Sequence, residues 1–321
     1  MIRRIFTGSF WLTGVACATV AIATAAQAGH VRYISTTGSN ANPCTLAKPC
    51  KTLQRGINRT PVRGELRILA SGDYGSNGNI GKSITISGNG NTVTIINPIT
   101  VNKASATVVL RGLALNGRAS ADHGIRIIAA RTVHVERCVV YGFPGRGIRD
   151  QSAGNLFILD SIFRNNGNQG LSIFASGAVT VTVDNSRFEN NQGGMQIGSN
   201  GGSIDVAINR TVVAGNTGDG IEVTSGARVI ITRTVAAHNS GAGYATSTGS
   251  QLTIESSAAH NNTNGLVANA NTNTRISASV FVNNVTGINN NGGTVLTRGN
   301  NTASGNTNAD TVGTLIALPG V

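Results

Sequence analysis

Two arginines, a histidine and two aspartates stand close together in the sequence. They are Asp122, His123, Arg126, Arg149 and Asp150. A pair of guanidinium groups can bind a carboxylate through paired hydrogen bonds, and His123 or Arg149 could accept a proton from a ligand held there. The alternative interpretation is a solvated basic surface. The choice depends on whether the fold brings these side chains to one face, and hence on the elements that carry them.

Those elements belong to a repeat. From about residue 108 the sequence repeats itself every 22 to 26 residues. Each unit has an alternating strand, a small residue, a second short strand and then usually an asparagine. The successive units read VHVERCVVYGF, LFILDSIFRNN, VTVDNSRFENN, VAINRTVVAGN, VIITRTVAAHN, LTIESSAAHNN, RISASVFVNN and TRGNNTASGN.

Alternation within the units assigns the side chains that point inward. One row is aliphatic throughout and consists of Val135, Ile158, Val183, Ile208, Ile231, Ile254 and Ile276. A second row is small and mildly polar and consists of Cys138, Ser161, Ser186, Thr211, Thr234, Ser257 and Ser279. Cys138 fits this second row by size, so we interpret it as a packing residue and not as a reactive thiol.

An asparagine recurs once per unit, at Asn166, Asn191, Asn216, Asn239, Asn262, Asn284 and Asn306. Asparagine accepts left-handed backbone, and stacked side-chain amides can hydrogen-bond from coil to coil. We therefore expect a structural asparagine ladder at one turn. A glycine soon after it opens a third strand, as in Gly124-Ile125 and Gly147-Ile148.

Each unit thus has three short strands and no helix. Equivalent strands must pair in parallel, about 4.8 Å apart, which predicts an all-β fold, a three-sided parallel β-helix of about nine or ten coils. Leucine-rich, propeller and calcium-binding nonapeptide repeats do not match this pattern. The outward row after each glycine reads Arg126, Arg149, Ser172, Gln196, Glu222, Ala245 and Val267, which places the two arginines on neighbouring coils.

The first 28 residues have the form of an export signal. Arg3 and Arg4 precede a mostly apolar run, and Ala26-Gln27-Ala28 is a cleavage motif. A membrane anchor is the alternative, but no later stretch is apolar enough to span a membrane. We expect a secreted or periplasmic protein without a transmembrane span in the mature chain.

Cys44 and Cys50 flank a short loop, and in an exported chain such a pair predicts a disulfide. No histidine pair stands beside them at metal-ligand spacing, so we expect no metal site.

The chain carries a net charge of +12. Loss of Arg3 and Arg4 with the signal would leave 12 − 2 = +10. Such a surface favours anions, among them acidic polysaccharide, lipopolysaccharide phosphate and nucleic acid. Aromatic residues make up only 4% of the chain, too few for a platform that stacks bases, so we do not expect a nucleic-acid partner.

The pattern V-x-I-x-x-S-x-F-x-x-N…G-I-x-I, across roughly residues 80 to 310, resembles the coil of the right-handed parallel β-helix proteins of the pectin-lyase-like superfamily. Residues 31 to 75 also resemble the opening of such proteins, with an amphipathic helix over Lys51 to Asn58 that would cap the open end of the solenoid. This divides the chain into a signal peptide (1–28), an N-terminal cap with the disulfide (29–79) and a repeat domain (80–321).

The resemblance also suggests where catalysis would occur. Polygalacturonase-like relatives pair aspartates on adjacent coils, but the matching Asp122 and Asp219 lie four coils apart, roughly 19 Å, and cannot act together. Pectate-lyase-like relatives hold calcium with several aspartates and use an arginine as base. Here only Asp122 and Asp150 are in reach, so calcium is expected only if the protein is a lyase, and no other cofactor is expected.

Two functions remain open. The first is a non-catalytic exported β-helix that binds an acidic polysaccharide or a cell-surface glycan, and it rests on the missing paired acids. The second is a polysaccharide-acting enzyme, a lyase of a uronate-rich polymer, and it rests on the fold, the basic charge and the Arg126 and Arg149 cluster. The lyase interpretation requires Asp122, Arg126, Arg149 and Asp150 to point to one surface.

Overall fold

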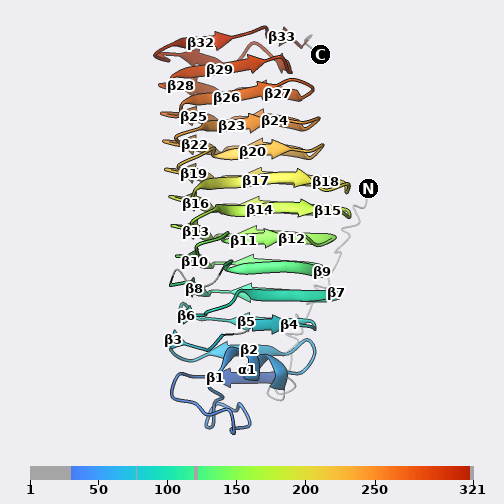
Figure 1. The fold of residues 1–321 in the computed structure, drawn as a ribbon, viewed down its shortest axis with the longest axis vertical. Coiled ribbons are helices and arrows are strands. Elements are labelled where there is room, and N and C mark those ends of the chain that lie inside the picture. Colours follow the sequence, from blue (N-terminus) through green and yellow to red (C-terminus); the bar gives the residue numbers. More distant parts are fainter. Residues whose placement is uncertain (1–29, 77, 119–121, 319–321) are drawn as a thin grey trace, which may run out of the picture.

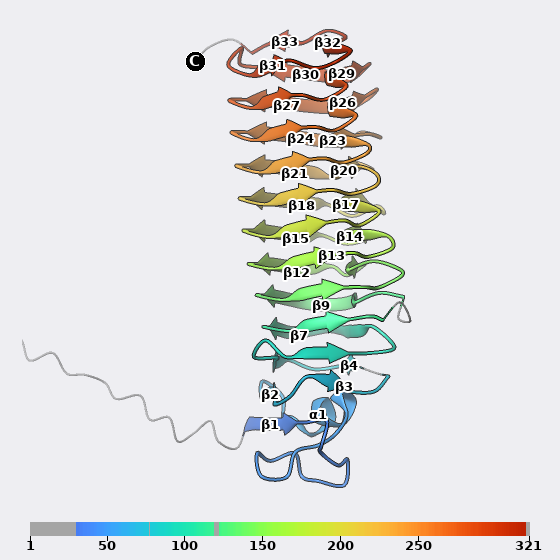
Figure 2. The same cartoon turned by 90° about the vertical axis from the view of Figure 1, so that its left-hand side faces the viewer.

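The computed structural model describes residues 30–76, 78–118 and 122–318. They form a column of stacked turns that runs from the N-terminal to the C-terminal end of this region (Figures 1 and 2). The predicted signal peptide at residues 1–28 lies outside the described residues. Within them, no helix is long and apolar enough to cross a membrane.

Each turn contributes strands to three ladders, A, B and C, and all pairings between the named strands are parallel. Ladder A consists of β1 (Val31–Ile34), β2 (Glu65–Ile68), β5 (Ile84–Ser87), the second halves of β7 (Ile99–Arg111) and β9 (Ile125–Glu136), β12 (Gly154–Leu159), β15 (Val179–Asp184), β18 (Ile204–Asn209), β21 (Arg228–Thr232), β24 (Gln251–Glu255), β27 (Asn273–Ser277), β30 (Thr294–Thr297) and β33 (Ile316–Ala317).

Ladder B consists of β4 (Gly78–Ile80), the first halves of β7 and β9, β11 (Ile148–Asp150), β14 (Gln169–Ala175), β17 (Gly193–Ser199), β20 (Ile221–Thr224), β23 (Ala242–Thr246), β26 (Asn264–Asn269), β29 (Thr286–Asn291) and β32 (Ala309–Val312). Ladder C, at the left edge of Figure 1, consists of β3 (Gly72–Asp73), β6 (Thr92–Thr94), β8 (Ala114–Asn116), β10 (Val139–Tyr141), β13 (Ile162–Arg164), β16 (Arg187–Glu189), β19 (Val212–Ala214), β22 (Val235–Ala237), β25 (Ala258–His260), β28 (Val280–Val282) and β31 (Thr302–Ser304).

The three-sided parallel β-solenoid predicted from the repeat is confirmed. Ladders A and B form one 22-stranded sheet because β7 and β9 run through both, and ladder C is an 11-stranded sheet. The described chain therefore has about eleven turns, where the repeat suggests nine or ten. The additional turns carry β3 and β6, which precede the regular repeat that begins near residue 108.

The interior is filled by the inward rows of the three ladders. The predicted aliphatic row of ladder A, from Val135 to Ile276, is at most 1% exposed at every position. In ladder C the rings of Phe163 and Phe188 stack on neighbouring turns, with centroids 4.9 Å apart. Aliphatic side chains fill this narrow core, which explains how so few aromatic residues suffice.

The small polar row at the turn from ladder A to ladder C forms a column of hydrogen bonds. The N–H of Cys138 donates to Oγ of Ser161 at 3.1 Å, and that hydroxyl donates to the carbonyl of Leu159 at 2.8 Å. The Ser and Thr members repeat this bond to the carbonyl two residues earlier. The row is small and polar because its hydroxyls satisfy buried backbone groups, in addition to the tight packing expected from the sequence.

A second column, the asparagine ladder, lies at the turn that follows ladder C. From Asn166 to Asn284, each backbone N–H donates to Oδ1 of the next ladder asparagine at 2.9–3.2 Å. Each Nδ2 also donates to that same oxygen at 2.8–3.3 Å. These six asparagines are at most 3% exposed. The ladder therefore joins consecutive turns through the protein interior.

The left-handed residue at this turn is the one before each ladder asparagine, which corrects the sequence-based explanation. Left-handed φ angles of 53° to 66° occur at Asn165, Asn190, Gly215, His238, Asn261, Asn283 and Gly305. The ladder positions require asparagine because its amide both accepts and donates, and not because of their own backbone conformation.

A short helix lies at the N-terminal end of the column. Helix α1 (Leu53–Arg59) packs against β1 and β4, and the Thr52 side chain accepts from the N–H of Arg55 at its start. The predicted capping helix is therefore present, beginning two residues later than expected because Thr52 is its N-cap. Gly56 allows a close approach at this contact, since a Cβ there would lie 2.7 Å from side-chain methyl groups of Ile34 and Leu66, which would have to shift.

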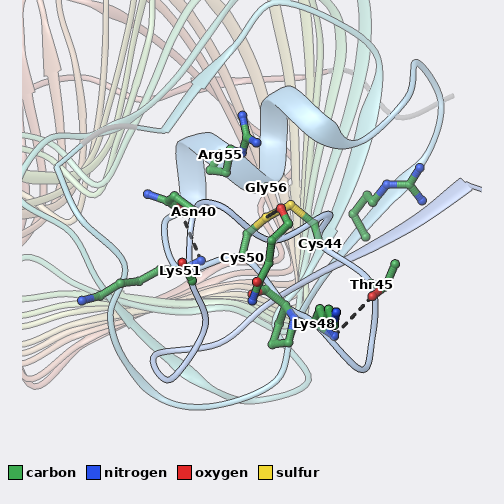
Figure 3. Close-up of a disulfide and its surroundings, with 12 residues drawn as sticks. Asn40, Cys44, Thr45, Lys48, Cys50, Lys51, Arg55 and Gly56 are labelled. Carbon is green, nitrogen blue, oxygen red and sulfur yellow. Dashed lines mark hydrogen bonds between the residues drawn. A yellow bond between two sulfur atoms is a disulfide. The ribbon is translucent and has the colours of Figure 1, made fainter.

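Cys44 and Cys50 form the expected disulfide in the loop before this helix (Figure 3). Both cysteines are fully buried. Oδ1 of Asn40 accepts from the N–H groups of Lys51 and Thr52 at 3.2 and 3.1 Å, so the loop is tied to the start of the helix. Parallel pairing already begins inside the segment assigned to the cap, since β1 pairs with β2 and β2 with β5.

Asn239→Ala is expected to destabilise the solenoid by about 3 kcal/mol or more, because its amide makes hydrogen bonds with Asn216, Val213 and Asn262 whose buried partners would be left unpaired. Asn273→Ala, at an exposed position of β27, is the matched control and should change stability by less than about 0.5 kcal/mol. Thermal unfolding followed by circular dichroism measures both. Equal effects of the two variants would contradict the structural role of the ladder.

Candidate functional site

One outward row of ladder B carries both arginines of the predicted cluster. Arg126 of β9 is in register with Arg149 of β11, and the row continues through Ser172, Gln196 and Glu222 on the next three strands. We call this row the arginine face. Since neighbouring parallel strands are about 4.8 Å apart, the two arginines belong to adjacent turns; their strands β9 and β11 lie next to each other in Figure 1.

The arginines of this face lack carboxylate partners. Within residues 30–76, 78–118 and 122–318, neither Arg126 nor Arg149 forms a salt bridge, and the buried Nε of Arg126 has no hydrogen-bond partner. Arg146, just before β11, donates to Oε1 of Gln169 at 3.0 Å. Burial, and then the charge of Arg149, lower the pKa of Arg146. Three cations thus lie close together, and an anion between them would relieve their repulsion.

His123 is turned into the protein. Its side chain is 3% exposed, and its Nδ1 accepts from the backbone N–H of Arg146 at 3.2 Å. Its Nε2 lies 3.2 Å from the carboxylate of Asp122, in a charge contact that is not a hydrogen bond. Burial, the largest effect, together with Arg146 and Arg149, lowers the pKa of His123. The neutral imidazole therefore positions the turn before β9 and does not face a ligand.

Asp150 points away from the arginine face. It is in register with Ile127 and Ile173, whose side chains fill the core, and it is 1% exposed. Its Oδ1 accepts from the N–H and the hydroxyl of Ser152 at 2.9 and 2.7 Å. Strand alternation already contained this information, because Asp150 directly follows the outward Arg149.

The five candidate residues therefore do not converge. Arg126 and Arg149 share the outer face, and the Asp122 side chain is 77% exposed at its edge. His123 and Asp150 are buried. Convergence on one surface, the condition for the lyase interpretation, is not met. The described residues also contain no group of three or more His, Cys, Asp or Glu side chains that could hold a metal ion.

The other end of the arginine face is acidic and hollowed. Nε2 of Gln196 donates to Oε2 of Glu222 at 2.9 Å, and Oδ1 of Asp219 accepts from the N–H of Ala242 at 2.6 Å. Hollows of about 120 and 210 Å³ share Asp219 and Glu222 in their lining. Gln169 and Gln192 also line the first hollow. The sequence assigned them no role because Gln169 begins β14 and Gln192 lies just before β17, both outside the repeated rows.

A larger hollow, of about 440 Å³, lies on ladder A between β15 and β27. Ala207 and the half-exposed Ile230 contribute to its lining. Its Asp205 and Arg228 form an ion pair through two contacts of 2.6 and 2.8 Å. These two charges neutralise each other, whereas the arginines of the arginine face are unpaired.

The buried carboxyl of Asp150 predicts a pH-dependent stability. Burial raises its pKa to about 6, against an opposing effect of the Ser152 hydrogen bonds. Since the folded pKa exceeds the unfolded value of about 4, the contribution of this group to stability is complete below about pH 4 and is lost as the pH rises through about 6. The loss should be on the order of 2–3 kcal/mol.

Asp150→Asn should therefore be stabilised relative to the wild type at neutral pH and should lose this advantage in acid. The difference between the two thermal unfolding midpoints, followed from about pH 4 to about pH 7, isolates this group from all others. Asp160→Asn, at an exposed position, is the control and should show little change with pH. A pH-independent difference for Asp150→Asn would show that the carboxyl titrates normally.

Comparisons with solved structures give the same fold at low sequence identity. Pectate lyase Pel9A superposes with a TM-score of 0.61 at 13% identity, covering 85% of this chain and 78% of that one. The A-module of the mannuronan C-5 epimerase AlgE4 from Azotobacter vinelandii has a TM-score of 0.55 at 16% identity, covering 80% of this chain and 89% of that one. No curated protein sequence matches the chain.

These likenesses show a shared fold. A family model confirms the predicted resemblance to right-handed parallel β-helix proteins. The model of the right-handed β-helix region matches residues 74–210 and 182–314, which is most of the chain. With its parallel ladders and inward rows, the chain belongs to the right-handed β-helix family.

Proposed function

We propose that the protein is an exported β-helix that binds an acidic polysaccharide along the arginine face without cleaving it. The observation that carries this proposal is the register of Arg126 with Arg149, two outward cations on adjacent turns with no acidic partner among the described residues. A guanidinium group presents a planar fork of donors that matches a carboxylate.

The direction of the row favours a linear polymer as the ligand. The arginine face runs along the solenoid axis, and all its members except the buried Ser172 are partly exposed. An extended chain lying along the axis would therefore meet Arg126 and Arg149 about 4.8 Å apart, and Gln196 and Glu222 farther along. The carboxylates of the polymer would lie on Arg126 and Arg149. Its hydroxyl groups would be bound farther along by Gln196, Glu222 and Asp219, which line the two hollows.

The names of the structural neighbours support the choice of ligand. Pectate and mannuronan, which appear in the names of the lyase and the epimerases, are both polymers of uronic acids. The net charge of +12 favours attraction of such polyanions over long distances. The signal-like residues 1–28 and the Cys44–Cys50 disulfide support export to an oxidising compartment.

The burial of two acid–base candidates, His123 and Asp150, favours binding over catalysis, and it leaves Arg149 as the one candidate proton acceptor on the arginine face. Proton transfer needs a group within hydrogen-bond reach of the ligand. The imidazole of His123 and the carboxyl of Asp150 are both turned inward. A carboxylate bound to the arginine face would therefore be held, with neither group facing it.

Replacement of both arginines by alanine tests the site. Arg126→Ala/Arg149→Ala should weaken binding of oligogalacturonate or oligomannuronate by at least about tenfold, because each lost charge-assisted hydrogen bond contributes about 1.5–3 kcal/mol. Isothermal titration calorimetry measures this affinity, which should also fall as salt is added.

Arg275→Ala/Arg298→Ala is the matched control, since it removes the same charge from exposed arginines on another face. If this control weakened binding and the Arg126/Arg149 variant did not, the proposed location of the binding site on the arginine face would be wrong. A rise in absorbance near 235 nm with either oligosaccharide, with or without calcium, would reveal elimination and would overturn the non-catalytic assignment.

A further inference from the structure

Two histidines at the end of ladder C lie side by side. His260 is the last residue of β25, and His238 directly follows β22 on the preceding turn. Their ring centroids are 5.7 Å apart, with the ring planes at 83°. The side-chain amide of Asn261 lies next to both, with its Nδ2 3.4 Å from Nε2 of His238 and 3.2 Å from Nδ1 of His260. Two ring nitrogens thus face a single atom.

The contacts to Asn261 indicate which ring nitrogens of the pair act as hydrogen-bond acceptors. A side-chain amide nitrogen has two hydrogens and no lone pair available as an acceptor. It therefore donates one hydrogen to each imidazole, and both ring nitrogens that face it present a lone pair. The amide occupies the position where an ion that accepts two lone pairs would lie.

The backbone holds the three residues in place. The N–H of His238 donates to the carbonyl of His260 at 3.1 Å, and the N–H of Asn261 donates to the carbonyl of Asn283 at 3.1 Å. His260 is paired in the ladder with Ala237 on one side and with Val282 on the other. Only side-chain torsions remain free, so little order would have to be gained on binding a ligand.

We propose that His238, His260 and Asn261 bind a divalent transition-metal ion, with Zn²⁺ as the representative. The Asn261 amide would rotate by half a turn so that Oδ1 replaces Nδ2 as the group facing the imidazoles, which gives two nitrogen donors and one oxygen donor. Water would complete the coordination. Imidazole suits Zn²⁺, Cu²⁺ and Ni²⁺, whereas Ca²⁺ and Mg²⁺ take oxygen ligands, so these two ions are not expected here.

The movement needed to coordinate Zn²⁺ is small and involves side chains that are accessible to solvent. Zinc binds imidazole nitrogen at about 2.0–2.1 Å, which is shorter than the present distances from Nδ2 to the two rings. His238 and Asn261 are exposed and His260 is partly exposed. Their side chains can therefore move toward the ion while the backbone stays fixed. The site lies beside ladder C and does not depend on glycan binding at the arginine face.

Isothermal titration calorimetry of the protein, prepared without a polyhistidine tag, with ZnCl₂ tests the site. One ion should bind near neutral pH, and binding should weaken in acid because both imidazoles must be neutral. His238→Ala and His260→Ala should each lower the affinity by about tenfold or more. His134→Ala removes an imidazole that stacks on Phe157, away from the pair, and should leave Zn²⁺ binding unchanged.

Asn261→Asp tests the third ligand by a gain of affinity, which a misfolded variant could not produce. A carboxylate in place of the amide oxygen adds a negative charge to the ion's surroundings, and Asp tolerates the left-handed backbone found there. Tighter Zn²⁺ binding is the expected result. The proposal is overturned if the wild type does not bind Zn²⁺, if the two histidine variants bind it as the wild type does, or if Asn261→Asp does not tighten binding.

Discussion

At the turn after ladder C, the backbone N–H of one ladder asparagine donates to the side-chain oxygen of the ladder asparagine on the next turn, and this hydrogen bond fixes how successive turns align. Asn216, for example, donates from both its N–H and its Nδ2 to Oδ1 of Asn239. Because these amides are buried, a register slip would leave several of them unpaired in a medium of low dielectric. The serine and threonine hydroxyls at the opposite end of ladder C repeat the arrangement. From Cys138 to Asn306, two columns of hydrogen bonds therefore hold the turns at both ends of their shortest strand.

Everything on the surface depends on that register. A shift of one residue in a strand exchanges its inward and outward side chains. Arg126 and Arg149 form a pair because their strands align residue for residue, and the same alignment turns Asp150 into the core. The buried Asp150 is an exception among the aliphatic neighbours of its row, and only Ser152 is seen to compensate for its desolvation. The buried asparagines of the ladder and the small polar row at the other end of ladder C are instead arranged in columns that bond from turn to turn.

The repeat made the fold predictable because the same chemistry recurs at each turn. The aliphatic row, the asparagine column and the outward row of Arg126 and Arg149 all follow from strand periodicity, and the structure contains them as expected. Features that occur once were harder to foresee. The burial of His123 goes with its single contact to the backbone N–H of Arg146, which no period describes. The His238 and His260 pair was missed because the two residues occupy different columns and meet on a diagonal, with His260 aligned to Ala237.

Stacking in register places Arg126 and Arg149, which are 23 residues apart in the sequence, side by side on the proposed binding face along the solenoid axis. The most direct measurement is a crystal structure of the protein with a uronate oligosaccharide of several residues. If the arginine face binds an acidic polysaccharide as proposed, the sugar chain will lie along the axis over β9, β11 and the following strands of ladder B. Its carboxylates will contact the guanidinium groups of Arg126 and Arg149. A sugar chain bound in the ladder A hollow, or one that leaves both arginines without contact, would contradict this proposal.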